Sequence, residues 1–223
     1  MTIFKRQSQH YLILSALLVG VYFLITDAIL TGQFLSVTTG VWLAIAIAIP
    51  IVHQTYVWLT WRSELCHGSI SRLLGKHGFT FYAIGFATLI ISRLVSITLL
   101  AISNRGTLGI DPIISFSIAL ILLIPSSYLI YSVHRYFGVK RAFGIDHFDM
   151  SYRSAALVKK GIFRYTDNGM YTVGLLIFWM PGLLMRSQAA LLVAAFTHIY
   201  IWVHYYCTEL PDIREIYGRN VKP

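Results

Sequence analysis

The residues best suited to chemistry lie in a short polar stretch, residues 161–171, which reads Gly-Ile-Phe-Arg-Tyr-Thr-Asp-Asn-Gly-Met-Tyr. It stands directly before two apolar runs, and the second run continues into another polar stretch, residues 208–217. Charged and amide groups placed beside a bilayer are costly unless they find polar partners. The pattern therefore indicates that the two stretches bind a polar ligand at the membrane surface.

The last apolar run carries a polar face of its own. His198, Trp202, Tyr205 and Glu209 recur at i, i+4, i+7 and i+11, which places them on one face of a helix over about 16 Å. A polar stripe in a membrane helix normally faces a cavity or a protein interior. We expect it to lead from mid-membrane to residues 161–171, with Glu209, Tyr205 and His198 as candidate catalytic groups. A purely structural role, with His198 bonded between helices, is the alternative. His204 points elsewhere and is expected at the membrane interface.

The first polar stretch resembles a motif of the integral membrane methyltransferases, the family of isoprenylcysteine carboxyl methyltransferase and phospholipid N-methyltransferase. That motif reads Gly-Pro-Tyr-Arg-Tyr-x-Arg-His-Pro-x-Tyr and opens a helical hairpin. Its fixed positions are occupied here by Gly161, Arg164, Tyr165 and Tyr171. The phospholipid branch has Asp-Asn-Pro-Met-Tyr at the end of the motif, and this chain has Asp-Asn-Gly-Met-Tyr at residues 167–171.

The second polar stretch resembles the motif that follows the hairpin in the phospholipid branch, Glu-Glu-Pro-Phe-Thr-x-Glu-Ile-Tyr. The chain has Leu210 in place of the second Glu and keeps Glu209, Pro211, Glu215, Ile216 and Tyr217. Two such motifs, in order and on either side of a hairpin, are more specific than either motif alone.

The resemblance implies that S-adenosylmethionine binds at the cytoplasmic face. Glu209 would bind its ammonium or ribose diol, Arg164 its carboxylate, and the aromatic rings its adenine or sulfonium. The cofactor-binding residues implied are Gly161, Arg164, Tyr165, Asp167, Asn168, Met170, Tyr171 and Glu209. No metal is expected, because Asp146, His147 and Asp149 lack further spaced ligands and are interpreted as solvated loop residues.

The elements that position these residues follow from composition. Of the 223 residues, 57% are hydrophobic and 12% are charged, about half the charged fraction of soluble domains. A bilayer-spanning helix needs about 20 apolar residues. Six runs approach or exceed that length, so we expect an all-α polytopic membrane protein with about six transmembrane helices and a C-terminal helical hairpin. The runs are residues 11–30, 41–61, 79–102, 113–133, 170–185 and 189–206.

The charge distribution predicts the orientation. With six spans, one side of the membrane receives only Arg105 and Arg186, and the other receives fifteen basic residues, which places both termini in the cytoplasm. The membrane is expected to be a bacterial inner membrane or the endoplasmic reticulum. Because the basic residues are scattered over membrane-flanking loops, nucleic-acid binding is excluded. The fifteen are Lys5, Arg6, Arg62, Arg72, Lys76, Arg135, Lys140, Arg141, Arg153, Lys159, Lys160, Arg164, Arg214, Arg219 and Lys222.

The chain is expected to divide into two parts. Residues 1–133 form a four-span scaffold, and residues 134–223 hold the cytoplasmic loop, the hairpin and the S-adenosylmethionine site. A short helix is predicted over residues 151–160, with a serine cap and a glycine stop. Cys66 and Cys207 are expected as free thiols. Arg93, in the middle of the third run, is a candidate functional residue unless a partner such as Asp27 makes it structural.

Other classes of protein fit less well. The eight histidines are too scattered for the histidine boxes of a membrane desaturase, and the nucleophile motif of a rhomboid protease is missing. A transporter would show inverted repeats or paired broken helices, and a sterol-reductase-like enzyme would use a nicotinamide cofactor. The motifs favour methyl transfer to a lipid-embedded acceptor, preferably a phospholipid amine. A prenylcysteine carboxylate and a small thiol remain open as acceptors.

Overall fold

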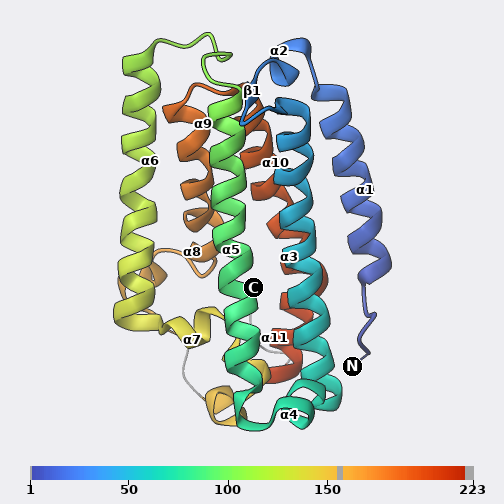
Figure 1. Ribbon diagram of the computed structural model, residues 1–223. Coiled ribbons are helices and arrows are strands. Elements are labelled where there is room, and N and C mark those ends of the chain that lie inside the picture. Colours follow the sequence, from blue (N-terminus) through green and yellow to red (C-terminus); the bar gives the residue numbers. More distant parts are fainter. Residues whose placement is uncertain (1, 155–157, 219–223) are drawn as a thin grey trace.

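The apolar runs of the sequence form long helices, because a helix satisfies its own backbone hydrogen bonds where lipid cannot. The computed structural model describes residues 2–154 and 158–218 of the chain (Figure 1). Its long helices run side by side: α1 (Gln7–Leu24), α3 (Thr39–His67), α5 (Gly78–Ser103), α6 (Pro112–Ser132) and α10 (Gln188–His204).

Short elements connect the long helices at the two ends of the bundle. At one end lie α2 (Asp27–Leu30) and a two-residue hairpin of β1 (Gln33–Phe34) and β2 (Val37–Thr38). The opposite end, called here the α11 end, holds the turns after α3 and α6 and the end of the chain (Figure 1). Its elements are α4 (Ser69–Leu74), η1 (Gly75–His77), η2 (Val133–Phe137), α7 (Val139–Ala142), η3 (Ile145–His147), η4 (Met150–Ser154), η5 (Gly161–Arg164), η7 (Tyr205–Glu209) and α11 (Leu210–Tyr217).

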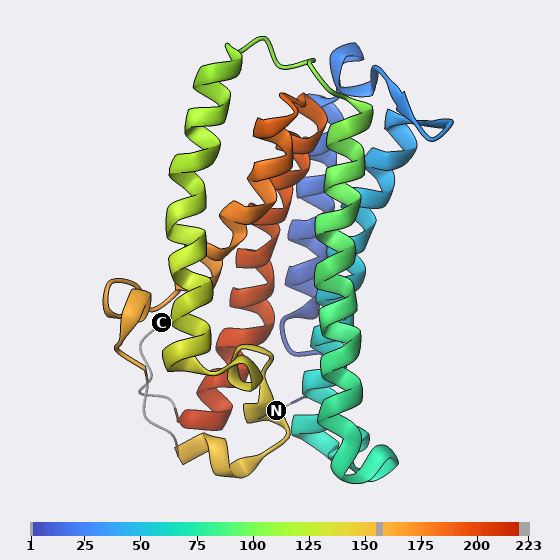
Figure 2. The same ribbon diagram turned by 60° about the vertical axis from the view of Figure 1, so that its left-hand side comes forward.

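Five of the six apolar runs form long helices, and the fifth run, residues 170–185, is shorter. In the part of the chain that the structure describes, five helices are long and apolar enough to cross a membrane. The fifth predicted run is instead a broken arm of α8 (Gly169–Thr172), the 3₁₀ helix η6 (Gly174–Trp179) and α9 (Met180–Leu184). Gly169 and Gly174 begin its first two pieces, and Pro181 lies in the first turn of the third, where its missing N–H is tolerated. The arm still pairs with α10 as the expected C-terminal hairpin (Figure 2).

The central element of the bundle is α10. The membrane-length segment that contains it has 61% of its most apolar window buried, against 22–33% for the other four segments. Small side chains allow this close approach, since Ala189, Ala190 and Ala194 are almost fully buried against α3 and α5. The helix that continues into the second motif is therefore the one held most firmly by its neighbours.

Asn104 fixes the end of the bundle opposite α11. Its side chain is 1% exposed and donates to the carbonyls of Ala28 (2.8 Å) and Thr31 (2.9 Å). Its amide oxygen accepts from the Ser187 hydroxyl and the Ala189 N–H, both at 2.9 Å. One buried amide thus joins the α2 loop, α5 and the start of α10, with its donors and acceptor all satisfied.

Arg62 joins several elements by hydrogen bonds at the α11 end. Its fully buried guanidinium donates to Asp212 Oδ1 (3.0 Å), to the Ile3 carbonyl (3.0 Å) and to the Cys207 and Thr208 carbonyls (2.9 and 3.3 Å). The last two carbonyls lie in η7, a π-helical turn whose wider winding disturbs the regular backbone ladder. Arg62 therefore ties α3 to η7, α11 and the N-terminal residues.

Two further expectations concern the cytoplasmic loop and the cysteines. The helix predicted over residues 151–160 is wrong in its described part, because η4 ends at Ser154 and residues 158–160 are not helical; residues 155–157 lie outside the described chain. Cys66 and Cys207 are free thiols, as predicted.

Replacing Arg62 by Ala should destabilise the protein strongly. The change leaves Asp212 buried without its cation, and breaking a buried pair in this way costs about 3–5 kcal/mol. We expect a large fall in the detergent unfolding temperature. Arg72→Ala, which removes the same side chain from an exposed site on α4, should have little effect. Equal melting of the two variants would contradict the role given to Arg62.

Candidate active site

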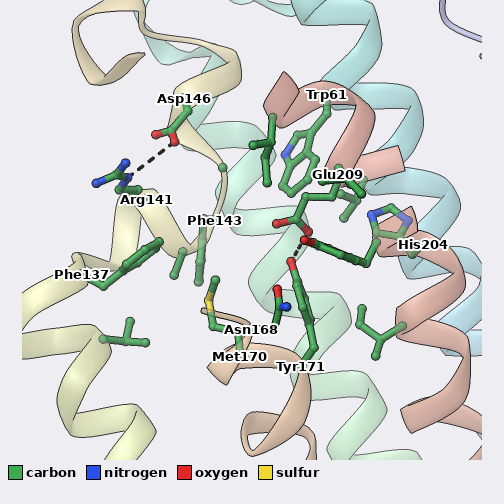
Figure 3. A pocket seen from close by; sticks show the side chains of 18 of the residues that line it. Trp61, Phe137, Arg141, Phe143, Asp146, Asn168, Met170, Tyr171, His204 and Glu209 are labelled. Carbon is green, nitrogen blue, oxygen red and sulfur yellow. Dashed lines mark hydrogen bonds and ion pairs between the residues drawn. The ribbon is translucent and has the colours of Figure 1, made fainter. Parts of the chain in front are cut away.

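The α11 end of the bundle encloses a cavity of about 820 Å³ (Figure 3). Its volume lies within the range of about 300–1,000 Å³ that is typical of small-molecule sites. The wall is contributed by α3, α5, α6, the loop after α7, the hairpin and α11. The four-span segment and the C-terminal segment therefore build the site together.

The two motifs meet in this cavity. The Tyr171 hydroxyl donates a hydrogen bond to the Glu209 carboxylate, and both side chains line the wall (Figure 3). The Tyr171 ring lies 5.3 Å from Tyr205 and 5.9 Å from Trp202, centroid to centroid. Glu209 ends the π-helical turn η7, and such turns often occur at functional sites because they redirect side chains. A carboxylate is thus held among aromatic rings.

The other residues of the first motif divide into two groups. Asp167, Asn168 and Met170 lie in the cavity wall with Tyr171. Asp167 is at the exposed mouth, where it forms an ion pair with Lys159. The first motif therefore contributes Phe163 and most of its C-terminal half to the cavity.

Gly161, Arg164 and Tyr165 lie outside the wall. Gly161 has a φ of +61°, and a Cβ there would lie 2.5 Å from the Ser132 hydroxyl oxygen. That hydroxyl accepts the Ile162 N–H at 3.0 Å, which fastens the segment to α6. Arg164 is exposed, and Tyr165 is 76% exposed. In this structure these positions shape and flank the site.

The predicted stripe on α10 is divided as well. Tyr205 and Glu209 line the cavity, and Trp202 packs on their partner Tyr171. His198 does not line it, and its Nδ1 accepts a hydrogen bond from Trp179 at 3.2 Å. Of the three catalytic candidates, the structure brings together Tyr205 and Glu209, while His198 bonds across the hairpin.

An aromatic wall that the motifs do not reveal faces these residues. The Trp61 and His147 rings stack at 4.2 Å with an angle of 17°. Gly144 makes room for the stack, because a Cβ there would lie 2.4 Å from the Trp61 ring. His147 Nε2 lies 3.6 Å from Asp212, the partner of Arg62. The expectation of a solvated His147 is wrong, since burial against Trp61 leaves it 5% exposed.

His204 is a second residue whose predicted position is wrong. It is 2% exposed, it lines the cavity, and neither ring nitrogen has a hydrogen-bond partner. His204 ends α10 on the side of the helix that faces the cavity, rather than the lipid, and this explains the difference. Buried polar groups without partners are uncommon and point to a bound water or ligand.

Three polar residues close the mouth of the cavity. Tyr217, from the second motif, donates its hydroxyl hydrogen to Asp146. Arg141 Nε lies 3.6 Å from Asp146 Oδ2, as marked in Figure 3, and its Nη2 lies 3.4 Å from the Tyr217 oxygen. Tyr217 thus joins α11 to α7 and to the segment after it.

The remaining loop carboxylate lies apart from the cavity. Asp149 is exposed, and hydrogen bonds from the Ser151 hydroxyl and backbone N–H lower the pKa of its carboxyl. Among the described residues, no three His, Cys, Asp or Glu side chains gather closely enough to hold a metal ion.

Gly144→Ala should disturb the cavity, because its methyl group would collide with the Trp61 ring. Gly138→Ala is the matched control, since Gly138 also has a positive φ (93° against 81°) but nothing within 4 Å of the added Cβ. Both variants carry backbone strain from the positive φ, about 1–2 kcal/mol at Gly144 in the left-handed region. We expect a change in tryptophan fluorescence only for Gly144→Ala. The same spectral change in both variants would contradict the packing described.

Part of the chain matches the model of a known protein family. The family model described as phospholipid methyltransferase matches residues 114–220, from the start of α6 to the end of α11. No curated protein and no solved structure gives a significant match to the chain. The matched segment contains both motifs and every element of the hairpin. It confirms the membrane methyltransferase family that the motifs indicated: residues 114–220 carry the sequence pattern of the phospholipid methyltransferases.

Proposed function

We propose that the protein transfers a methyl group from S-adenosylmethionine to the amine of a membrane phospholipid. The observation that carries the proposal is the contact between Tyr171 and Glu209, which joins the two family motifs in the wall of one cavity. The family match supports methyltransferase activity and a lipid acceptor. The same proposal places both termini in the cytoplasm. It also divides the chain into a scaffold (residues 1–133) and a cofactor-binding part (residues 134–223).

The residues present fit the cofactor. Glu209 offers a carboxylate to its ammonium or ribose diol, and the Trp61–His147 stack and Tyr205 offer aromatic surface to its adenine or sulfonium. The unpartnered ring nitrogens of His204 offer further hydrogen bonds. The cofactor carboxylate requires a cation, and Arg141 lines the cavity whereas Arg164 does not. We therefore transfer that role from Arg164 to Arg141.

When bound, S-adenosylmethionine supplies an electrophilic methyl group on a sulfonium. The chain's own task is alignment and exclusion of water, because methyl transfer is an in-line displacement that gains from proximity. The apolar lining from α5, α6 and the hairpin provides the dry environment. An ammonium acceptor must lose a proton before it can attack. We propose Glu209 as the group that accepts it, with Tyr205 and Tyr171 holding the carboxylate in place.

Other acceptors and classes make different demands. A prenylcysteine carboxylate is already nucleophilic and needs no base, and a thiol needs only deprotonation. A reductase would bind a nicotinamide cofactor in the same cavity. A transporter would not need Glu209 to accept a proton. The Asp-Asn-x-Met-Tyr and Glu-x-Pro sequences of the phospholipid branch favour the lipid amine.

Calorimetric titration with S-adenosylhomocysteine in detergent tests the cofactor site. We expect micromolar binding by the wild type and at least tenfold weaker binding, about 1.4 kcal/mol, by Glu209→Gln. Glu215→Gln makes the same chemical change at an exposed position of α11 and should bind as the wild type does. No binding by folded wild-type protein would overturn the proposal.

A second titration tests which arginine serves the cofactor. Arg141→Gln should weaken binding of S-adenosylhomocysteine about tenfold, because it removes a charge-assisted hydrogen bond inside the cavity. Arg164→Gln should stay within about twofold of the wild type, since Arg164 is exposed outside the wall. The reverse order would show that the original assignment to Arg164 is correct.

A further inference from the structure

A buried cation lies in the cavity wall away from both motifs. Arg93, on α5, is 5% exposed and lines the cavity together with His53 and Gln54 of α3. It also lies outside the segment that matches the family, residues 114–220. Neither the motifs nor the family match gives it a role.

Arg93 is poorly compensated by the residues that the structure describes. Its Nη1 has a long contact of 3.4 Å with His53 Nδ1, and its Nε and Nη2 have no hydrogen-bond partner. Its guanidinium lies 4.9 Å from the centroid of the Phe178 ring. Asp27, the partner considered from the sequence, is exposed on α2 and forms no ion pair with it. An intramembrane cation of this kind normally meets an anion.

The cavity has opposite charges at different depths. Glu209 contacts Tyr171, whereas Arg93 lies over Phe178, seven residues further along the same arm of the hairpin. Seven residues of this arm, most of them in the 3₁₀ helix η6, correspond to about 10–14 Å, so the cation lies deeper than the carboxylate. A zwitterionic headgroup would meet both, with its amine towards Glu209 and its anion towards Arg93.

Apolar side chains line the cavity beside these charges and suit the apolar part of a lipid. Phe86 and Ile90 of α5, Leu129 of α6, Val133 of η2 and Leu175 of the hairpin all line the cavity. We propose that Arg93, assisted by His53, binds the phosphate of the acceptor phospholipid. The assignment rests on the proposed function. It adds the selectivity for the acceptor, because Arg93 would favour amines that carry a phosphate over other amines.

The test compares two acceptors in nanodiscs: a phosphatidylethanolamine and a long-chain alkylamine without phosphate. Arg93→Gln should raise the KM for the phospholipid at least tenfold, and leave both the KM for the alkylamine and the affinity for S-adenosylhomocysteine unchanged. Arg105→Gln, the same change at an exposed position beyond α5, is the control. Arg93→Lys should retain part of the preference.

Several outcomes would overturn the assignment. Loss of S-adenosylhomocysteine binding in Arg93→Gln would assign Arg93 to the cofactor carboxylate, and equal loss with both acceptors would make it structural. A second measurement uses only the wild-type protein and compares its unfolding temperature with three ligands. Short-chain phosphatidylethanolamine should raise this temperature more than a short-chain amine or inorganic phosphate does. Equal stabilisation by inorganic phosphate would refute a lipid site. Absence of any methyl transfer alongside selective lipid binding would refute the proposed function alone.

Discussion

The candidate site depends on the buried guanidinium of Arg62. A π-helical turn at η7 places Glu209 in the cavity, and such a turn is stable only if its displaced carbonyls find donors. Arg62 supplies donors to two of them and pairs with Asp212 one turn later. Asp212 in turn approaches His147, which stacks on Trp61 in the opposite wall. One cation on the scaffold thus orients both sides of the cavity.

The bundle combines a rigid end with a polar end. The Asn104 network fixes α2, α5 and α10 away from the site, so the small apolar residues of α10 can pack closely. At the α11 end the packing gives way to a cavity, and charged and aromatic side chains replace the apolar core. The proposed reaction would use this contrast, since its lipid acceptor would come from the bilayer and its polar methyl donor from water.

The sequence was most informative where chemistry fixes residue spacing. The two motifs were expected at one site, and their residues Tyr171 and Glu209, 38 positions apart, do meet there; the long apolar helices followed from composition. The sequence did not identify Trp61, His147 and His204 as cavity residues, because no local pattern shows which face of a uniformly apolar helix meets a distant loop. Arg164 and Tyr165 match the family motif but lie outside the cavity. The fifth run is the shortest of the six, and its glycines break it into the short pieces α8, η6 and α9.

The most direct test of the account is transfer of a labelled methyl group. Wild-type protein in nanodiscs containing phosphatidylethanolamine would be incubated with methyl-labelled S-adenosylmethionine, and the extracted lipids analysed for label. The account predicts labelled phospholipid with the wild type and with Glu215→Gln, and none with Glu209→Gln. Unlabelled lipid with wild-type protein that binds S-adenosylhomocysteine, or full labelling with Glu209→Gln, would contradict it.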